Sequence, residues 1–120
     1  MKISDSEWKV MNLLWEKSPL TITQMTHIFE VQEGWSKSMV ITYLNRLEKK
    51  GAVWHDQGRK AKYYYPKIDQ SDTDAEAARG FLDKVFHGNI GMMVSTMVQK
   101  EKLSKEDLEE LERLLKEGKE

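Results

Sequence analysis

The sequence predicts a mainly helical fold that carries one small β-hairpin, and three observations lead to this prediction. Two apolar segments at helical spacing each follow a capping sequence, SDSE at residues 4–7 and TITQ at residues 21–24. A third amphipathic segment comes next, GWSKSMVITYLNRLEKKG at residues 34–51. It is followed by AVWHDQGRKAKYYYP at residues 52–66, where residues of high β-propensity flank a Gln-Gly break.

The limits of the first two helices follow from local signals. The first helix is expected to begin after Ser4 and to stop near Lys17, because Pro19 disfavours helical backbone at the residue before it. The second is expected to begin after Thr21 and to end before Gly34. Both helices therefore start at a side chain that can accept a hydrogen bond from a free backbone amide.

The third helix is expected to open at Trp35-Ser36 and to end at Gly51, which suits the left-handed position after a helix. Val40, Leu44 and Leu47 form its apolar stripe. In the hairpin that follows, the tip is placed at Gln57-Gly58. Three helices followed by a hairpin form a winged helix-turn-helix, in which the hairpin is the wing. Residues 1–70 are therefore predicted to be a winged-helix DNA-binding domain.

The remaining residues, 71–120, are predicted to form a helical dimerisation region. The polar stretch DQSDTD at residues 69–74 suits either a linker or a helix cap, and three short helical patterns follow it, the last capped by Ser104. So few residues bury too little surface to enclose a core alone, and a second copy of the chain is the favoured cover. The residues assigned to dimerisation are Phe81, Val85, Met93, Met97, Leu108, Leu111, Leu114 and Leu115.

Composition excludes several classes of protein. The 120 residues contain no cysteine, so disulfides, thiolate nucleophiles and cysteine-bound metals are excluded. No catalytic motif and no phosphate-binding glycine loop is present, so neither an enzyme nor a cofactor is predicted. His27, His55 and His87 lie on separate elements, so no metal site is predicted. The first ten residues lack a signal sequence and no run is apolar enough for a membrane span, which leads us to expect a cytoplasmic protein.

Positive charge is concentrated in the middle of the chain. The net charge is −1, yet residues 36–67 hold eight basic and two acidic residues, a local net charge of +6. This segment covers the third helix and the hairpin, and it indicates a surface that binds a polyanion.

The polar side of the third helix is predicted to read DNA bases. A solvated helix face usually carries Glu and Lys, whereas this one carries hydroxyl and amide groups that can meet base edges in the major groove. The residues assigned to base readout are Ser38, Ile41, Thr42 and Asn45. Ile41 has two alternatives of equal weight, contact with a thymine methyl group or with a neighbouring helix or the wing. The alternative for the whole helix is a core helix whose outer face is polar by chance.

Nearby cations and one hydroxyl are predicted to contact phosphates, which sets affinity and register without reading sequence. They are Ser36, Lys37, Arg46, Lys49, Lys50, Arg59, Lys60 and Lys62. The alternative for the charged hairpin tip is solubility alone. The run Tyr63-Tyr64-Tyr65 is assigned to strand packing in preference to base stacking.

Four stretches resemble the penicillinase-repressor family of bacterial winged-helix regulators. They are ISDSEWKVMNLLW, GWSKSMVITYLNRLEKKG, RKAKYYYP and LSKEDLEELERLL, and together they extend over nearly the whole chain. That family includes repressors of β-lactamase, methicillin-resistance and copper-transport genes. The resemblance implies a homodimer that binds a palindromic operator on double-stranded DNA and dimerises through its C-terminal helices.

The start of the third helix departs from the family pattern. Family members typically carry Trp-Ser-Pro-Lys-Thr, then Val or Ile, Arg and Thr. Here Trp35, Ser36, Val40 and Thr42 match this pattern. Lys37, Ser38, Met39 and Ile41 replace the proline, lysine, threonine and arginine. A different target sequence is therefore predicted.

The sequence also departs from the family at the features on which its two known release signals act. Its β-lactam-linked members are cleaved by a sensor protease at an Asn-Phe bond, and the equivalent bond here is Thr96-Met97. Its copper-responsive members use C-terminal cysteines, which this chain lacks. The predicted function is a dimeric, sequence-specific repressor. The alternatives are a winged-helix protein-interaction module without DNA binding, and an effector-sensing regulator with a ligand site in the C-terminal half.

Overall fold

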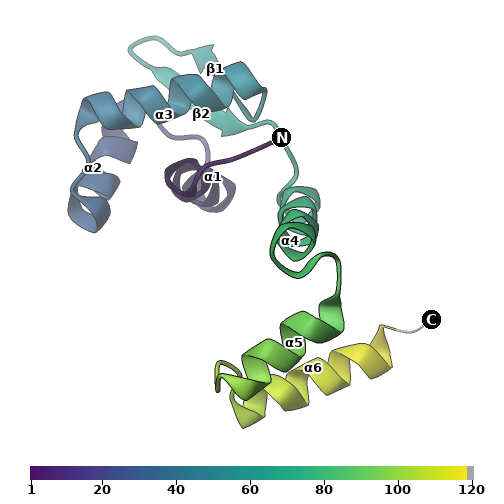
Figure 1. Ribbon diagram of the computed structural model, residues 1–120. Coiled ribbons are helices and arrows are strands. Elements are labelled where there is room, and N and C mark those ends of the chain that lie inside the picture. Colours follow the sequence, from purple (N-terminus) through teal and green to yellow (C-terminus); the bar gives the residue numbers. More distant parts are fainter. Residues whose placement is uncertain (119–120) are drawn as a thin grey trace. The chain divides into compact units, whose positions relative to one another are not determined.

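The computed structural model describes residues 1–118 and contains the predicted series of helices with a single hairpin among them (Figure 1). The elements follow in the order α1 (Asp5–Lys17), α2 (Ile22–Glu33), α3 (Lys37–Lys50), β1 (Val53–Gln57), β2 (Lys62–Pro66), α4 (Gln70–Phe86), α5 (Ile90–Gln99) and α6 (Lys105–Glu117). The chain divides into two compact units, Met1–Thr73 and a second unit that begins at Asp74. Among residues 1–118, no helix is both long and apolar enough to cross a bilayer.

The helix limits in the first unit agree with the local signals in the sequence. The hydroxyls of Ser4 and Thr21 accept hydrogen bonds from backbone amides in the first turns of α1 and α2, and both form full capping boxes. Gly34 and Gly51 end α2 and α3 with φ angles of 72° and 81°, a left-handed conformation that glycine adopts at little cost. The helical part of the winged helix-turn-helix is thus determined largely by local sequence.

The core of the first unit lies where α3 meets α1, α2 and β1. Its buried residues come from every element of the unit up to β2: Val10, Met11, Leu14, Leu20, Met25, Phe29, Trp35, Val40, Leu44, Leu47, Ala52, Val53 and Tyr64. The indole nitrogen of Trp15 also donates to the carbonyl oxygen of Ile68 at 3.0 Å, which fastens the segment after the hairpin to α1.

The hairpin is antiparallel, with Val53 opposite Pro66 and Gln57 opposite Lys62. Leu20, in the connection between α1 and α2, adds a short bridge to Tyr64 of β2, with mutual backbone hydrogen bonds of 3.3 and 2.9 Å. No local signal in the sequence predicts this third partner. It fixes the wing to the helices by backbone contacts as well as by packing.

Residues 69–74 form a helix start, and the boundary between the two units falls within this stretch, after Thr73. The carboxylate of Asp69 accepts a hydrogen bond from the amide of Asp72 at 3.0 Å, and α4 begins at Gln70. Aspartate competes well for a free amide at the start of a helix, so the polar stretch caps α4.

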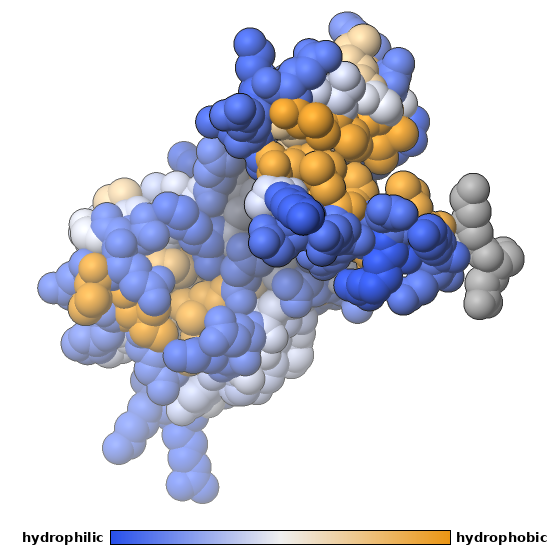
Figure 2. All heavy atoms as spheres, turned by 90° about the horizontal axis from the view of Figure 1, so that it is seen from below, coloured by the Kyte–Doolittle hydropathy of each residue, from blue (hydrophilic) through white to orange (hydrophobic). Residues whose placement is uncertain are grey.

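The second unit exposes much of its apolar surface. Ser104 caps α6 through the amide of Asp107 at 3.0 Å, as predicted. Among the described residues of α5 and α6, none is buried. Figure 2 shows apolar side chains gathered on one face of this unit. Its large exposed apolar residues are Phe81, Val85, Ile90, Met92, Val98, Leu108, Leu114 and Leu115.

The bond compared with the family's cleavage site also lies in this unit. Thr96 and Met97, at the position of the family's cleaved bond, both lie inside the helical backbone of α5. Residues 119 and 120, the last two of the predicted dimerisation region, lie outside the described residues.

Candidate nucleic-acid interface

The helix α3 is anchored on one side by a fully buried stripe of Val40, Leu44 and Leu47. At its first turn the hydroxyl of Ser36 accepts a hydrogen bond from the backbone amide of Met39 at 3.3 Å. The helix is therefore held by its stripe and by its backbone cap, and the side chains on its other faces are free to serve another purpose.

The residues assigned to base readout lie together on the outer side of α3. Ser38, Thr42 and Asn45 are exposed, while Ile41 is half-buried at the edge of this face. An exposed helix face of this kind can enter the major groove, where amides and hydroxyls meet the base edges.

Two of these hydroxyl groups already have partners inside the helix. Thr42 donates its hydroxyl proton to the carbonyl oxygen of Ser38 at 2.9 Å. The Ser38 hydroxyl lies 3.2 Å from the hydroxyl of Ser36, and one of the two donates a hydrogen bond to the other. Asn45 consequently offers the less encumbered donor and acceptor groups for a base edge.

The cations of α3 fall into two groups. Lys37, Arg46 and Lys49 are exposed, and the outer face carries Arg46 and Lys49 beside Asn45. Lys50 is different, because its ammonium donates to the carboxylate of Glu7 and, at 2.8 Å, to the carbonyl oxygen of Lys2. Lys50 thus has an internal role that the sequence did not indicate.

The carboxylate of Glu7 is almost completely buried, with 1% of its side chain exposed. Burial by itself raises its pKa, but the hydrogen bond and charge of Lys50 and the hydrogen bonds from Ser4 outweigh burial, so the pKa of Glu7 lies below its usual value. The pair joins the start of α1 to the end of α3 and keeps an ionised carboxylate in the core.

Glu48 is the acidic residue of α3, and it too is paired. Its carboxylate lies 2.6 Å from Nδ1 of His55 on β1. This contact links α3 to the wing.

The wing tip presents two of the predicted phosphate contacts. The amide of Gly58 donates to the carbonyl oxygen of Ala61 at 2.9 Å and closes a loop that carries Arg59 and Lys60, both exposed. A Cβ atom at Gly58 would lie 2.5 Å from the Tyr63 ring and 2.8 Å from the Ala61 oxygen, so the loop requires glycine here. Lys62 follows at the start of β2 and is also exposed.

The tyrosine run packs within the wing. Tyr64 is buried in the core and faces His55, while Tyr65 stacks on Trp54 with ring centroids 4.5 Å apart. Burial together with the nearby charge of Glu48 raises the pKa of Tyr64. Strand packing is therefore the role of Tyr64 and Tyr65 in this structure, as the sequence favoured.

The structure also groups residues that the sequence did not assign. A shallow hollow of about 160 Å³ is lined by Thr21 and Thr23 at the start of α2, Lys37 at the start of α3, and Ala61 and Lys62 of the wing, together with Ile22. Helix starts attract anions through their free amides and their dipole. The capping sequence TITQ was the available signal, but only the fold shows that it lies next to Lys37 and Lys62.

Within residues 1–118, no three His, Asp or Glu side chains are grouped so that they could hold a metal ion. The candidate interface consists of amide, hydroxyl, apolar and cationic side chains on α3 and the wing.

Comparison with known proteins assigns the chain to a family. Residues 3–117 match the family model described as penicillinase repressor. The methicillin resistance regulatory protein MecI of Staphylococcus aureus (strain N315) is 32% identical over 114 residues, which cover 95% of this chain and 93% of MecI. The penicillinase repressor of Bacillus licheniformis is 32% identical over 118 residues, which cover 98% of this chain and 92% of that protein.

Two solved structures resemble the first unit. The solution structure of the DNA-binding domain of the repressor BlaI matches with a TM-score of 0.55 and 35% identity, covering 59% of this chain and 87% of that one. The Bacillus licheniformis BlaI monomeric form, solved in complex with the blaP half-operator, matches with a TM-score of 0.54 and 35% identity, covering 60% of this chain and 88% of that one. These matches confirm the winged-helix fold, and with the family match over residues 3–117 they establish that the chain belongs to the penicillinase repressor family.

Proposed function

We propose that this protein represses transcription by binding a specific DNA operator as a homodimer. In this proposal α3 enters the major groove and the wing contacts the phosphate backbone. The observation that carries it is the outer face of α3, where exposed Ser38, Thr42 and Asn45 lie beside exposed cations. The related BlaI was solved in complex with a half-operator, which supports operator binding by the same fold, and a helix-turn-helix places its second helix in the major groove.

Asn45 is the main reader in this proposal. Its amide can donate to and accept from the edge of adenine at the same time, which a single hydroxyl cannot do. Thr42 acts mainly as an acceptor, because its hydroxyl proton is engaged within the helix, and the Ser38 hydroxyl is already in contact with that of Ser36. Ile41, half-buried at the edge of the face, contributes apolar contact there.

Six cations contact phosphates in each bound protomer. Lys50 is left out of this set, because Glu7 and Lys2 hold its ammonium. The hydroxyl of Ser36 remains a candidate for a phosphate contact at the start of α3. The six cations are Lys37, Arg46, Lys49, Arg59, Lys60 and Lys62.

A two-fold dimer is proposed from the second unit. Its apolar residues on α4, α5 and α6 are largely exposed within one chain, and an apolar patch of this kind usually marks an interface. Phe81, Val85, Met93 and Met97 would pack with the leucines of α6 from the partner. Two-fold symmetry then requires an operator of two half-sites, about 10 bp or a multiple of it apart.

The decisive experiment selects binding sites from a pool of random double-stranded DNA and compares variants on the selected site. Asn45→Ala should weaken binding to the selected site by ~1–3 kcal/mol while binding to random DNA stays nearly the same. Affinities are measured by gel shift at constant salt. Failure to enrich any sequence would reject the proposed function, and equal losses on both DNAs would remove Asn45 from base readout.

The wing should act on all DNA sequences alike. With about six phosphates neutralised by each protomer of the bound dimer, log K should fall against log[salt] with a slope of about −11. Arg59→Ala combined with Lys60→Ala removes two contacts from each protomer and should bring this slope about four units closer to zero, on selected and random DNA equally. Lys9→Ala is a matched control, because Lys9 is exposed on α1 and paired with Glu33 at 2.6 Å. A slope unchanged by the wing substitutions would contradict the phosphate role.

A further inference from the structure

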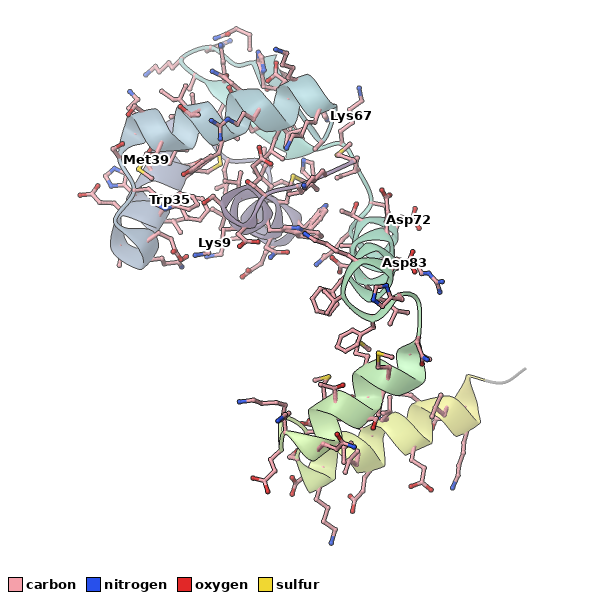
Figure 3. All side chains as sticks on the ribbon, in the orientation of Figure 1. Lys9, Trp35, Met39, Lys67, Asp72 and Asp83 are labelled. Carbon is pink, nitrogen blue, oxygen red and sulfur yellow. The ribbon has the colours of Figure 1, made fainter. Side chains whose placement is uncertain are left out.

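The outer face of α3 contains a shallow hollow with an apolar wall. It has a volume of about 180 Å³ and is lined by Ser38, Met39, Thr42, Tyr43 and Arg46. Met39 and Tyr43 have no role in the proposed base readout so far. Met39 is 37% exposed, so an apolar side chain stands in a face that otherwise suits polar contacts. Figure 3 labels Met39 at the N-terminal end of α3, near Trp35.

The aliphatic hydroxyl groups beside Met39 have little capacity left to donate hydrogen bonds into the hollow. The hydroxyl proton of Thr42 goes to the carbonyl oxygen of Ser38 at 2.9 Å. The Ser38 hydroxyl forms a hydrogen bond with the Ser36 hydroxyl, which itself accepts from the amide of Met39. With these groups satisfied inside the helix, the lining between Met39 and Thr42 suits an apolar group better than a polar one.

One wall of the hollow is held in place from the core. The ring of Tyr43 packs on Trp35, with centroids 4.9 Å apart, and Trp35 packs on Phe29, with centroids 4.5 Å apart. Trp35 and Phe29 are both buried. The lining also includes the flexible thioether of Met39, one turn before Tyr43 on α3, which can adapt to the shape of a ligand. Arg46 supplies positive charge at the same hollow, which favours a group carried by DNA.

We propose that this hollow receives the 5-methyl group of a thymine in the operator, with Met39 as its main contact and Tyr43 as its fixed wall. The inference rests on the proposed function, because it needs α3 in the major groove. The thymine methyl is the apolar group that bases present there, and it distinguishes thymine from cytosine. Met39 is in this way a specificity-determining residue that acts by apolar contact.

The test replaces thymines one at a time with deoxyuridine in the DNA site selected by the wild-type protein. Deoxyuridine lacks only the methyl group and keeps the same hydrogen-bonding edge. From ~0.8 kcal/mol per buried methyl-sized group, the wild type should lose about three- to fivefold in affinity at one thymine of a half-site. Met39→Ala should bind both DNAs with nearly equal affinity, whereas Met39→Leu should keep most of the preference.

Val31→Ala is the matched control. Val31 is an apolar residue 87% exposed on α2, and this variant should lose affinity for deoxyuridine just as the wild type does. If no thymine shows the loss, or if Met39→Ala shows it as fully as the wild type, the inference is wrong while the selected site still supports the proposed function. If no site can be selected at all, the proposed function fails and this inference fails with it.

Discussion

Replacing both Leu114 and Leu115 with aspartate is expected to convert the proposed dimer into monomers and to abolish tight operator binding. These side chains are 51% and 61% exposed within one chain, so the substitutions should leave the unit's own packing largely intact. A fully buried leucine contributes ~1.5–3 kcal/mol. About half of that contribution is available to the interface for each leucine, and each substitution occurs in both protomers of a two-fold dimer. The Kd of the dimer should therefore rise by about two orders of magnitude or more.

Arg113→Asp is the control for this pair of substitutions. It changes the net charge of the chain by the same amount, and it removes only an exposed ion pair with Glu117, a kind of contact that contributes little. Sedimentation equilibrium at micromolar concentration measures the dimer in each variant, and gel shift on the selected site measures the effect on DNA. A double leucine variant that sediments like Arg113→Asp would reject α6 as part of the interface.

Lys50→Met is expected to produce the largest loss of folding stability among the cation substitutions. It leaves the carboxylate of Glu7 buried without its partner, while the methionine keeps the apolar part of the side chain. Because the Lys50 side chain is itself 34% exposed, we expect a loss near the lower end for a broken buried pair, about 2–3 kcal/mol at neutral pH. Urea denaturation followed by circular dichroism measures this loss.

The loss of folding stability caused by Lys50→Met should depend on pH in a defined direction. Since the pKa of Glu7 in the folded protein lies below its usual value, the unfolded chain binds more protons in the acidic range. The stabilisation that the ionised Glu7 contributes is therefore fully present above the pKa of Glu7 in the unfolded chain. It disappears as the pH falls through the lower pKa of Glu7 in the folded protein. The difference in the free energy of unfolding between wild type and Lys50→Met should become smaller over the same pH range.

Lys49→Met provides the comparison for this second experiment. Lys49 is the neighbouring lysine on α3, and it is exposed. Its replacement should change the free energy of unfolding only slightly, as is usual for surface substitutions. If Lys50→Met lowers the free energy of unfolding no more than Lys49→Met does at neutral pH, the stabilising role of Lys50 beside Glu7 is contradicted. Lys50 then counts again as a predicted phosphate contact.

The helix limits were predictable because their causes are local. Ser4, Thr21 and Ser104 each accept a hydrogen bond from an amide three residues later, and Gly51 adopts the conformation that the end of a helix requires. Such contacts involve neighbours in sequence, and the residue types are selective for them. The limits of these helices could therefore be predicted from the sequence alone.

The features that the sequence did not reveal depend on distant partners. Leu20 pairs with Tyr64, and Lys50 with Glu7, across long stretches of chain. Thr42 shows a subtler case: the helical pattern placed it on the outer face, but it could not tell whether the hydroxyl was free or bonded to Ser38. Residue type and spacing predict which residues share a face, whereas the hydrogen-bond partners of a side chain depend on the folded backbone.

The cap at the start of α3 has a consequence for how this protein can change its target. Ser36 accepts from the backbone amide of position 39, a bond that any side chain except proline leaves available. The side chain of Met39 is exposed, and the stripe that holds the helix lies on its other side. New side chains at this position can therefore be sampled, in evolution or in the laboratory, with little risk to folding, so DNA preference can drift while the scaffold stays constant.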